Sequence, residues 1–246
     1  MNTRFTIVTV VYNDKVGLKK TLDSVSEQTY RQFEYIVIDG GSTDGGVELL
    51  QNYSSMISYW VSEKDDGIYD AMNKAILKAS GDYINFMNAG DVFYNNYVLQ
   101  KVSEKIEQDA VVAFGDLVVD KNGLLIIKAK PFYEHLPLHH DAGFNHQCTF
   151  VKTTYAKRYP FNLNYRLAAD YNMIITLFRL GVRFQQLDIP VAIYDLNGVS
   201  QTKRNQHLRE TLEIDNPQKK VYNFILYCFF SVRHWTYSFL KKILPI

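Results

Sequence analysis

Cysteine is scarce in this chain of 246 residues. The two cysteines, Cys148 and Cys228, both lie in apolar stretches. A small secreted domain held together by disulfides carries more cysteines at regular spacing, so that class is excluded and we expect a reducing compartment. A signal peptide is also not indicated, because the N-terminal apolar run begins almost at once and has no cleavage pattern.

Charge of one sign is not in excess either. The chain has 27 Lys and Arg residues against 26 Asp and Glu residues, which gives a formal net charge of +1. This balance gives no indication of a nucleic-acid partner. Hydrophobic residues make up 47% and charged residues 22% of the chain, which is ordinary for a globular protein. The length is enough to bury a full core.

Strand and helix patterns alternate through the first part of the chain. Apolar runs at 5–11, 33–38 and 58–61, and another that begins at Tyr83, predict strands. Between them, apolar residues recur at helical spacing over 18–25, 47–50 and 68–79. We expect an α/β fold with a Rossmann-like, mostly parallel sheet and flanking helices. A further strand at 110–114 and a hairpin over 117–127 follow, with Asn122 and Gly123 at its turn.

Acid or amide side chains follow three of the predicted strands. They are Asn13 with Asp14 after the first strand, Asp39 after the second, and Asn88 with Asp91 after the strand that begins at Tyr83. Parallel strands bring their carboxyl ends to one edge of the sheet, so we expect these groups to converge on one crevice. Taken alone, Asp91 fits two interpretations equally well: it opens a turn, or it binds a Mg²⁺ or Mn²⁺ ion that holds a diphosphate. The other two strand ends favour the ion.

Five motifs in order make the chain similar to a known family. They are the segments 9–13, 24–30, 37–45, 62–74 and 81–91, which read TVVYN, SVSEQTY, VIDGGSTDG, SEKDDGIYDAMNK and GDYINFMNAGD. The set resembles the inverting GT-A glycosyltransferases of family 2, although each motif alone is weak. The segment 65–74 is most similar to the branch that builds bacterial surface polysaccharides such as capsule, O-antigen or colanic acid. The resemblance implies a GT-A fold, which we expect to occupy residues 1–203.

The resemblance also implies where a nucleotide sugar binds. The donor is expected to be a UDP-sugar carrying a hexose or an N-acetylhexosamine, with GDP or dTDP left open. The residues at matching positions are Thr9, Val11, Tyr12, Asn13, Asp39, Asp66, Asn73, Asn88, Ala89 and Gly90. Asp91 matches the metal ligand, with Mg²⁺ or Mn²⁺ as the ion. The chain departs from the family in having one acid at 39–40, where two are common, and one charged residue in the motif at 88–91. A site in which the diphosphate and water supply most ligands fits this pattern, and metal independence stays open.

A carboxylate at the start of a predicted helix is the candidate catalytic base. Asp170 lies in the first turn, where a carboxylate also stabilises the helix dipole without any catalytic role. The resemblance favours catalysis, because family members place their base before this helix, although their usual preceding Glu is Ala169 here. In an inverting displacement such a base takes the proton of the acceptor hydroxyl.

Three histidines, at positions 139, 140 and 146, lie close together in the sequence. A zinc site is one interpretation, but their spacing fits no compact metal motif. We prefer a polar loop that contacts the acceptor, with His146 and Gln147 as its candidate residues.

The C-terminal residues 204–246 are expected to form a separate helical tail. Its uncharged run at 221–232 is too short for a membrane-spanning helix, which needs about 20 apolar residues. Aromatic residues at helical spacing, flanked by Lys and Arg, suit either a helix lying in a membrane interface or a homodimer contact. Both alternatives stay open, and the lipid-linked acceptors that the resemblance implies favour the membrane. We therefore expect a cytoplasmic protein with peripheral contact to the inner face of the plasma membrane.

The resulting hypothesis is transfer of one sugar, with inversion, to a lipid-linked or saccharide acceptor in cell-surface polysaccharide biosynthesis. Polymerisation is not expected, because the Gln-x-x-Arg-Trp signature of processive family members is absent. A nucleotidyltransferase is disfavoured, since it needs a Gly-rich loop after the first strand, where positions 12–15 read Tyr, Asn, Asp and Lys. The remaining alternative is a non-catalytic nucleotide-sugar-binding protein, because the motif at 88–91 has fewer acidic residues than is common in the family.

Overall fold

The computed structural model describes residues 3–121, 124–128, 145–194 and 204–218. The chain divides into two compact units, one made of residues 1–132 and 143–196 and the other of residues 133–142 and 197–246. All the described strands belong to the first unit. The described part of the second unit contains one helix, α8 (Arg204–Asp215). The predicted boundary at 203 and 204 stays a prediction.

Half of the sheet in the first unit is parallel. In this half the strands lie in the order β3-β2-β1-β4, with bounds Tyr59–Ser62 for β3, Phe33–Asp39 for β2, Phe5–Val11 for β1 and Tyr83–Phe86 for β4. Each neighbouring pair of these four strands is parallel. Their carboxyl ends therefore share one edge of the sheet, which we call the carboxyl edge.

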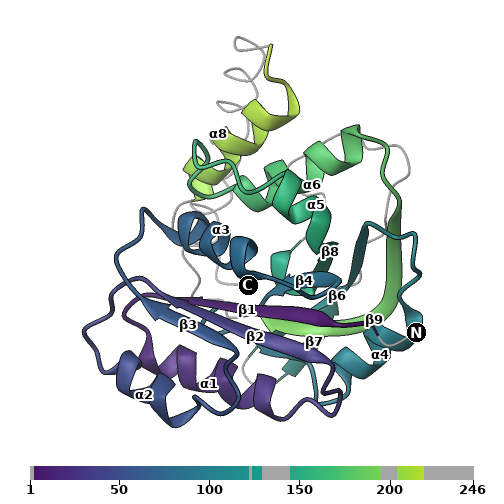
Figure 1. Ribbon diagram of the computed structural model, residues 1–246. Coiled ribbons are helices and arrows are strands. Elements are labelled where there is room, and N and C mark those ends of the chain that lie inside the picture. The colour runs from purple at the N-terminus through teal and green to yellow at the C-terminus, as the bar shows by residue number, and fades with distance from the viewer. Residues whose placement is uncertain (1–2, 122–123, 129–144, 195–203, 219–246) are drawn as a thin grey trace, which may run out of the picture. The chain divides into compact units, whose positions relative to one another are not determined.

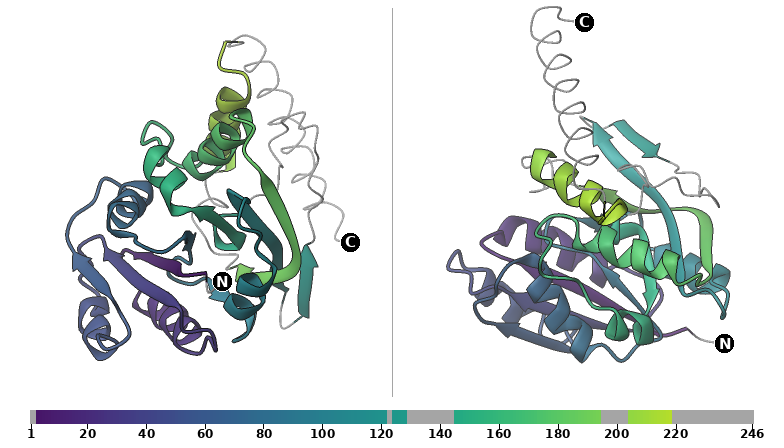
Figure 2. Two further views of the ribbon diagram at one scale, coloured as in Figure 1. Left: turned by 45° about the vertical axis from the view of Figure 1, so that its right-hand side comes forward. Right: turned by 90° about the horizontal axis from the view of Figure 1, so that it is seen from above.

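The other half of the sheet mixes both directions. It continues from β4 in the order β8 (Thr149–Lys152), β6 (Val112–Lys121), β9 (Phe184–Tyr194) and β5 (Val92–Phe93), and β7 (Leu124–Lys128) pairs with β6. Strand β8 is antiparallel to both β4 and β6, whereas β6 and β9 are parallel. Figure 2 shows the long strands β6 and β9 side by side in both views. The antiparallel strand β8 brings the segment before it back to the carboxyl edge.

Helices cover the two faces of the sheet (Figure 1). One face carries α1 (Lys15–Ser26), α2 (Gly46–Asn52) and α4 (Val98–Lys105), and the other carries α3 (Ile68–Lys78), α5 (Thr153–Arg158) and α6 (Ala169–Arg179). Side chains of a strand alternate between faces, so Ile7 packs in the core with Leu18 and Val8 packs in the core with Met72. These two buried layers fix where the strand ends lie.

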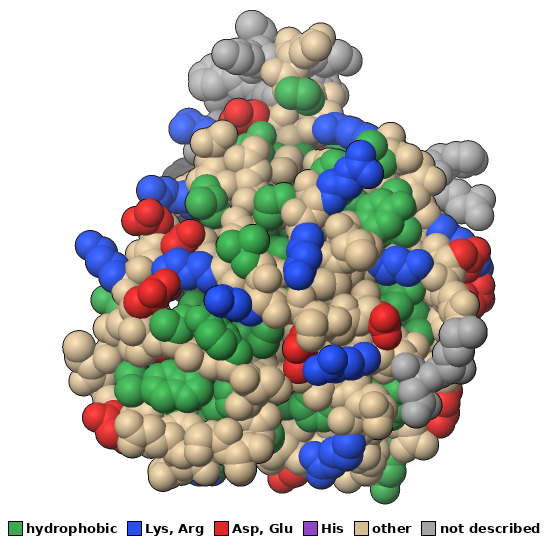
Figure 3. Space-filling model, viewed as in Figure 1, with side chains coloured by type: hydrophobic (Ala, Val, Ile, Leu, Met, Phe, Trp, Pro, Cys, Tyr) green, Lys and Arg blue, Asp and Glu red, His purple; other side chains and the backbone are tan. Residues whose placement is uncertain are grey.

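The predicted α/β fold is confirmed, and so is the hairpin formed by β6 and β7. Helix α6 ends before Gly181, which takes the positive φ of 69° that favours glycine. Elements β5, α4, α5 and β9 were not predicted. On the face seen in Figure 3, acidic and basic side chains are interspersed, which agrees with the balanced composition. In the described ranges no helix is long and apolar enough to cross a membrane.

Candidate active site

The loops after β1 and β2 are tied together by Asp39. Its side chain is 1% exposed and accepts hydrogen bonds from the backbone N of Gly41 (3.1 Å) and of Ser42 (2.9 Å). The hydroxyls of Ser42 and Ser62 also donate to it, both at 2.5 Å. Asn13, at a φ of 49°, donates its backbone N–H to the Ser42 hydroxyl at 2.7 Å. The Asp39 carboxylate therefore shapes this corner of the carboxyl edge.

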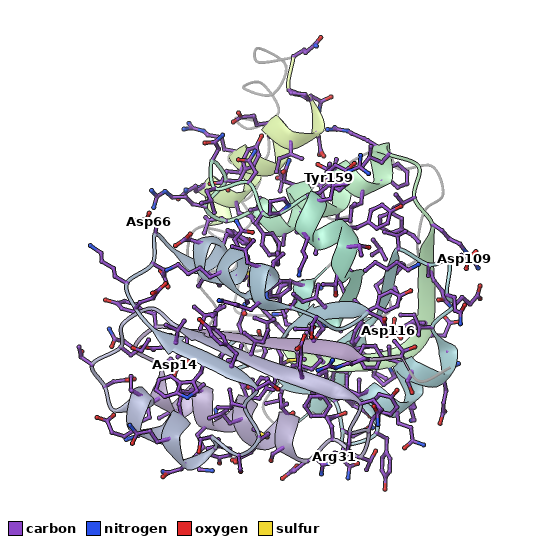
Figure 4. The ribbon with its side chains drawn as sticks, viewed as in Figure 1. Asp14, Arg31, Asp66, Asp109, Asp116 and Tyr159 are labelled. Atoms are coloured by element: carbon purple, nitrogen blue, oxygen red, sulfur yellow. The ribbon has the colours of Figure 1, made fainter. Side chains whose placement is uncertain are left out.

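An exposed aromatic ring lies beside an acid at the same corner. Tyr12 is 66% exposed. A Cβ on Gly40 would lie 2.6 Å from Asp65 Oδ2 and 3.3 Å from the Tyr12 ring, so a larger residue at position 40 would displace the Asp65 side chain. Asp66 is exposed on the loop before α3, and Figure 4 shows it on the same side of the molecule as Asp14, which begins α1. This arrangement suits a nucleobase stacked on the Tyr12 ring, with the Asp65 carboxylate close enough to accept a hydrogen bond from it.

Three of the residues expected to bind the nucleotide sugar lie beneath the carboxyl edge and hold its backbone in place. Thr9 is fully buried, and its hydroxyl donates to the carbonyl oxygen of Met87 at 2.7 Å. Val11 is also buried, and its carbonyl accepts the N–H of Gly40 at 2.9 Å. The Asn73 amide makes two hydrogen bonds to the backbone of Phe161, both at 2.9 Å. We therefore expect these side chains to position the donor site rather than to touch the donor.

The turn after β4 holds Asp91 at the carboxyl edge. The backbone N of Ala89 donates to the carbonyl of Val10 at 3.1 Å, and Gly90 takes a φ of 96°. The Thr21 hydroxyl contacts the carbonyls of both Asn88 and Asp91, at 3.1 and 2.7 Å. Asp91 is 6% exposed, and its Oδ2 accepts a hydrogen bond from the Gln147 amide at 3.0 Å. The structure thus brings the predicted metal ligand and one predicted acceptor residue together.

A short 3₁₀ helix, η1 (His146–Cys148), carries the other acceptor candidate. Buried Asn85 of β4 holds η1 in place, because its amide donates to the carbonyls of Gln147 (2.9 Å) and Thr149 (3.0 Å). His146 Nε2 lies 2.9 Å from Asn88 Nδ2, and His146 Nδ1 lies 3.0 Å from Asp170 Oδ2. The ring of His146 therefore joins the turn after β4 to the start of α6.

Asp170 is held at both carboxylate oxygens. The Tyr69 hydroxyl donates to its Oδ1 at 2.8 Å, and the backbone N of Tyr171 donates to the same oxygen at 2.9 Å. We call the connected side chains of Tyr69, Asp170, His146 and Asn88 the base network. It spans α3, α6, η1 and the turn after β4, which are distant in sequence.

The base network shifts the pKa values of both of its titratable central groups. Burial alone would raise the pKa of Asp170, but the hydrogen bonds from His146 and Tyr69 hold it below its ordinary value. Burial alone would lower the pKa of His146, but the hydrogen bond and charge of Asp170, together with the charge of Asp91, raise it above its ordinary value. At neutral pH Asp170 is therefore an ionised carboxylate, the form that accepts a proton.

The raised pKa of His146 gives a first testable prediction. We expect an NMR titration of the His146 ring to have a midpoint above the ordinary 6.5, and Asp170→Asn to lower that midpoint because burial is then less opposed. The spectrum of His146→Asn identifies the signal among the six histidines. A midpoint that Asp170→Asn leaves unchanged would show that the two groups do not interact in solution.

The residues around Asp91 fit a weakly held divalent ion. A buried carboxylate is a hard oxygen ligand of the kind that Mg²⁺ and Mn²⁺ prefer. The described residues contain no group of three or more His, Cys, Asp and Glu side chains that could hold a metal by themselves. Such an ion would thus need donor phosphate oxygens as well as Asp91. His139 and His140, of the disfavoured zinc interpretation, lie outside the described residues.

Four residues of this site were not predicted from the sequence. They are Ser42 and Ser62 around Asp39, Asn85 under η1 and Tyr69 against Asp170. Asn85 alone gave a signal, as a single amide inside the apolar run at 83–87. The others are common residue types whose roles depend on the fold.

Comparison with known proteins identifies the family. The sequence matches the family described as Glycosyl transferase family 2 over residues 6–172, which include every candidate residue from Thr9 to Asp170. It is 36% identical over 177 residues to an uncharacterized glycosyltransferase of Mycobacterium tuberculosis, an alignment that covers 69% of this chain and 66% of that protein.

Two solved structures share the fold. Residues 1–349 of S. aureus TarS in complex with UDP-GlcNAc superpose with a TM-score of 0.67 at 16% identity, covering 86% of this chain and 66% of that one. The mannosyltransferase PcManGT from Pyrobaculum calidifontis in complex with GDP-Man and Mn²⁺ gives 0.67 at 16%, covering 87% and 63%. This chain spans slightly less than two thirds of the length of each of these three relatives. Because the family match covers more than half of its residues, the chain belongs to glycosyl transferase family 2.

Proposed function

We propose that the protein is an inverting glycosyltransferase that moves one sugar from a nucleotide sugar to an acceptor hydroxyl, with Asp170 as the general base. The observation that carries the proposal is the base network, which joins Asp170 through His146 to Asn88 in the same turn as Asp91. A proton acceptor and a diphosphate-binding turn are the two parts that such a reaction needs in one place.

The proposed reaction is a single displacement. The acceptor O–H bond breaks, and its proton passes to Asp170 Oδ2, which accepts one hydrogen bond from His146 whereas Oδ1 accepts two. The acceptor oxygen bonds to the anomeric carbon from the face opposite the leaving group. The bond from that carbon to the diphosphate breaks with its electrons, so one negative charge moves from Asp170 to the leaving nucleoside diphosphate. When bound at Asp91, a Mg²⁺ or Mn²⁺ ion would stabilise charge on that diphosphate.

We infer a UDP-sugar as the donor. The exposed ring of Tyr12 next to Asp65 supports a small stacked nucleobase with an acid close by. TarS was solved with UDP-GlcNAc and PcManGT with GDP-Man, so a guanine donor is the direct alternative. A hexose or an N-acetylhexosamine fits the class of enzyme, and a lipid-linked or saccharide acceptor in surface-polysaccharide synthesis is part of the proposal.

A panel of nucleotide sugars tests the proposed function. The protein is mixed with UDP-, GDP- and dTDP-sugars, with and without Mg²⁺ or Mn²⁺, and both binding heat and release of free nucleotide are measured. We expect a UDP-sugar to bind best and to be hydrolysed slowly with metal, because water replaces the acceptor. Tighter binding of GDP than of UDP would overturn the choice of uridine. Binding without any hydrolysis would indicate the non-catalytic alternative.

The tail is proposed to dock the enzyme on the inner face of the plasma membrane, where a lipid-linked acceptor would lie. The residues concerned, 221–240, lie outside the described ranges, so the proposal rests on their aromatic sequence and on the Lys and Arg residues in and beside it. Each Lys or Arg near an anionic surface adds about 1 kcal/mol of attraction. We expect the full chain to float with anionic liposomes at low salt and a chain ending at residue 218 to stay behind. Failure to float, with a dimer that becomes a monomer after truncation, would assign the tail to oligomerisation.

A further inference from the structure

His146 has no part in the proton transfer proposed above, yet it occupies the centre of the base network. Its Nδ1 lies 3.0 Å from Asp170 Oδ2 and its Nε2 lies 2.9 Å from Asn88 Nδ2. One ring tautomer satisfies both contacts: Nδ1–H donates to the carboxylate, and Nε2 accepts from the amide. Each ring nitrogen is therefore used, and each contact reaches a different part of the site.

Gln147, the residue after His146, also contacts the turn after β4. Gln147 donates to Asp91 Oδ2 at 3.0 Å, so two consecutive side chains of η1 each hold one residue of the turn after β4. The backbone under both is held by the buried Asn85 amide. Such a doubly anchored segment fixes the distance between the turn and whatever His146 holds on its other side.

We propose that His146 is a positioning residue that holds the base and the donor-side turn in one fixed relation, so that the acceptor oxygen meets the anomeric carbon in line. The inference rests on the proposed function, since it gives His146 this task only if Asp170 is the base. A misplacement of about 1 Å in such a geometry costs on the order of 10²-fold in rate. The competing assignment, drawn from the sequence, is direct contact of His146 with the acceptor.

Two isosteric variants separate the contacts of the ring. Asn places its amide nitrogen near the position of Nδ1, and Gln places its own near Nε2. Because each variant keeps only one of the two contacts, we expect both His146→Asn and His146→Gln to lose about 10²-fold in kcat, with KM for the donor changed little in both. The probe is the nucleotide sugar of the panel that is hydrolysed fastest, and thermal unfolding checks that both variants fold. A wild-type kcat in either variant would overturn the proposal, because one contact alone would then be enough.

A double-mutant cycle with Asp170→Asn tests whether His146 acts through the base. If it does, His146→Gln changes the remaining rate by less than about threefold once the base is gone. If His146 instead contacts the attacking water, which takes the place of the acceptor hydroxyl in this assay, the variant costs the same factor in both backgrounds, and the proposal is wrong. A wild-type rate in Asp170→Asn itself would instead refute the proposed function. The two failures are thus distinguishable.

Discussion

Replacement of Asp170 by Asn is expected to slow sugar transfer by about 10²- to 10⁴-fold, the usual contribution of a positioned base. The amide keeps the shape of the side chain and can still accept the hydrogen bond from Tyr69, but it takes no proton. Donor binding should persist, because Asp170 contacts α3 and η1 and not the loops around Asp39. The measurements are calorimetry with the nucleotide sugar of the panel that binds best and the rate of nucleotide release.

Asp82→Asn is the matched control for this variant. Asp82 precedes β4, at the opposite end from the carboxyl edge, and accepts the backbone N–H of Arg4 at 2.7 Å, which an amide oxygen also accepts. We expect it to keep the wild-type rate. A loss of donor binding together with turnover in Asp170→Asn would mean that Asp170 serves the structure at the start of α6 and is not the base.

Asp91→Asn is expected to have an effect of similar size, by a different route. It removes the one charged oxygen ligand of the turn while the Gln147 amide still has an oxygen to contact. Loss of electrostatic stabilisation of a leaving group typically costs about 10²- to 10³-fold in kcat. The dependence on Mg²⁺ or Mn²⁺ should weaken in parallel, which a titration of metal against the hydrolysis rate measures.

Asp14→Asn provides the same chemical change at a neighbouring strand end. Asp14 accepts the N–H of Gly17 at 2.9 Å as the N-cap of α1, and Asn is an equally good N-cap, so the rate should not change. Normal metal-dependent turnover in Asp91→Asn would remove Asp91 from the metal site and leave the ion to the donor phosphates alone.

The strand ends were predictable because buried parallel strands leave a clear pattern. The apolar run at 5–11 became β1 with the same bounds, Asp39 is the last residue of β2, and Asp91 follows β4 at the carboxyl edge. Hydrophobic periodicity thus located the candidate residues of the site before any contact was known.

The long strand β9 was not predictable from the same pattern. Two consecutive polar residues, Gln185 and Gln186, break its alternation, and Pro190 argues against a central strand. In the structure Pro190 pairs with Asp116 at an irregularity of the register, where the loss of a ladder hydrogen bond is tolerated. Sequence rules for polar residues and proline therefore argued against β9, although its neighbours in the sheet stabilise it as a strand.

The contacts within the site were also beyond sequence reasoning. His146 and Asp170 carry no shared pattern, and their pairing depends on η1 and α6 meeting at the carboxyl edge. Thr9 shows the same limit, because the family motif assigns it to the donor site whereas the contact of its buried hydroxyl with Met87 depends on the fold. Motifs identify residues that matter, but which of them touch a ligand is decided by the faces of the strands.

The most direct test of the account is the anomeric configuration of the sugar first released from a UDP-α-sugar. Proton NMR during hydrolysis, before the free sugar equilibrates, distinguishes the two anomers. A single displacement with Asp170 as base predicts the β-anomer. First release of the α-anomer would contradict it, because retention requires a different mechanism with two displacements or a front-face attack.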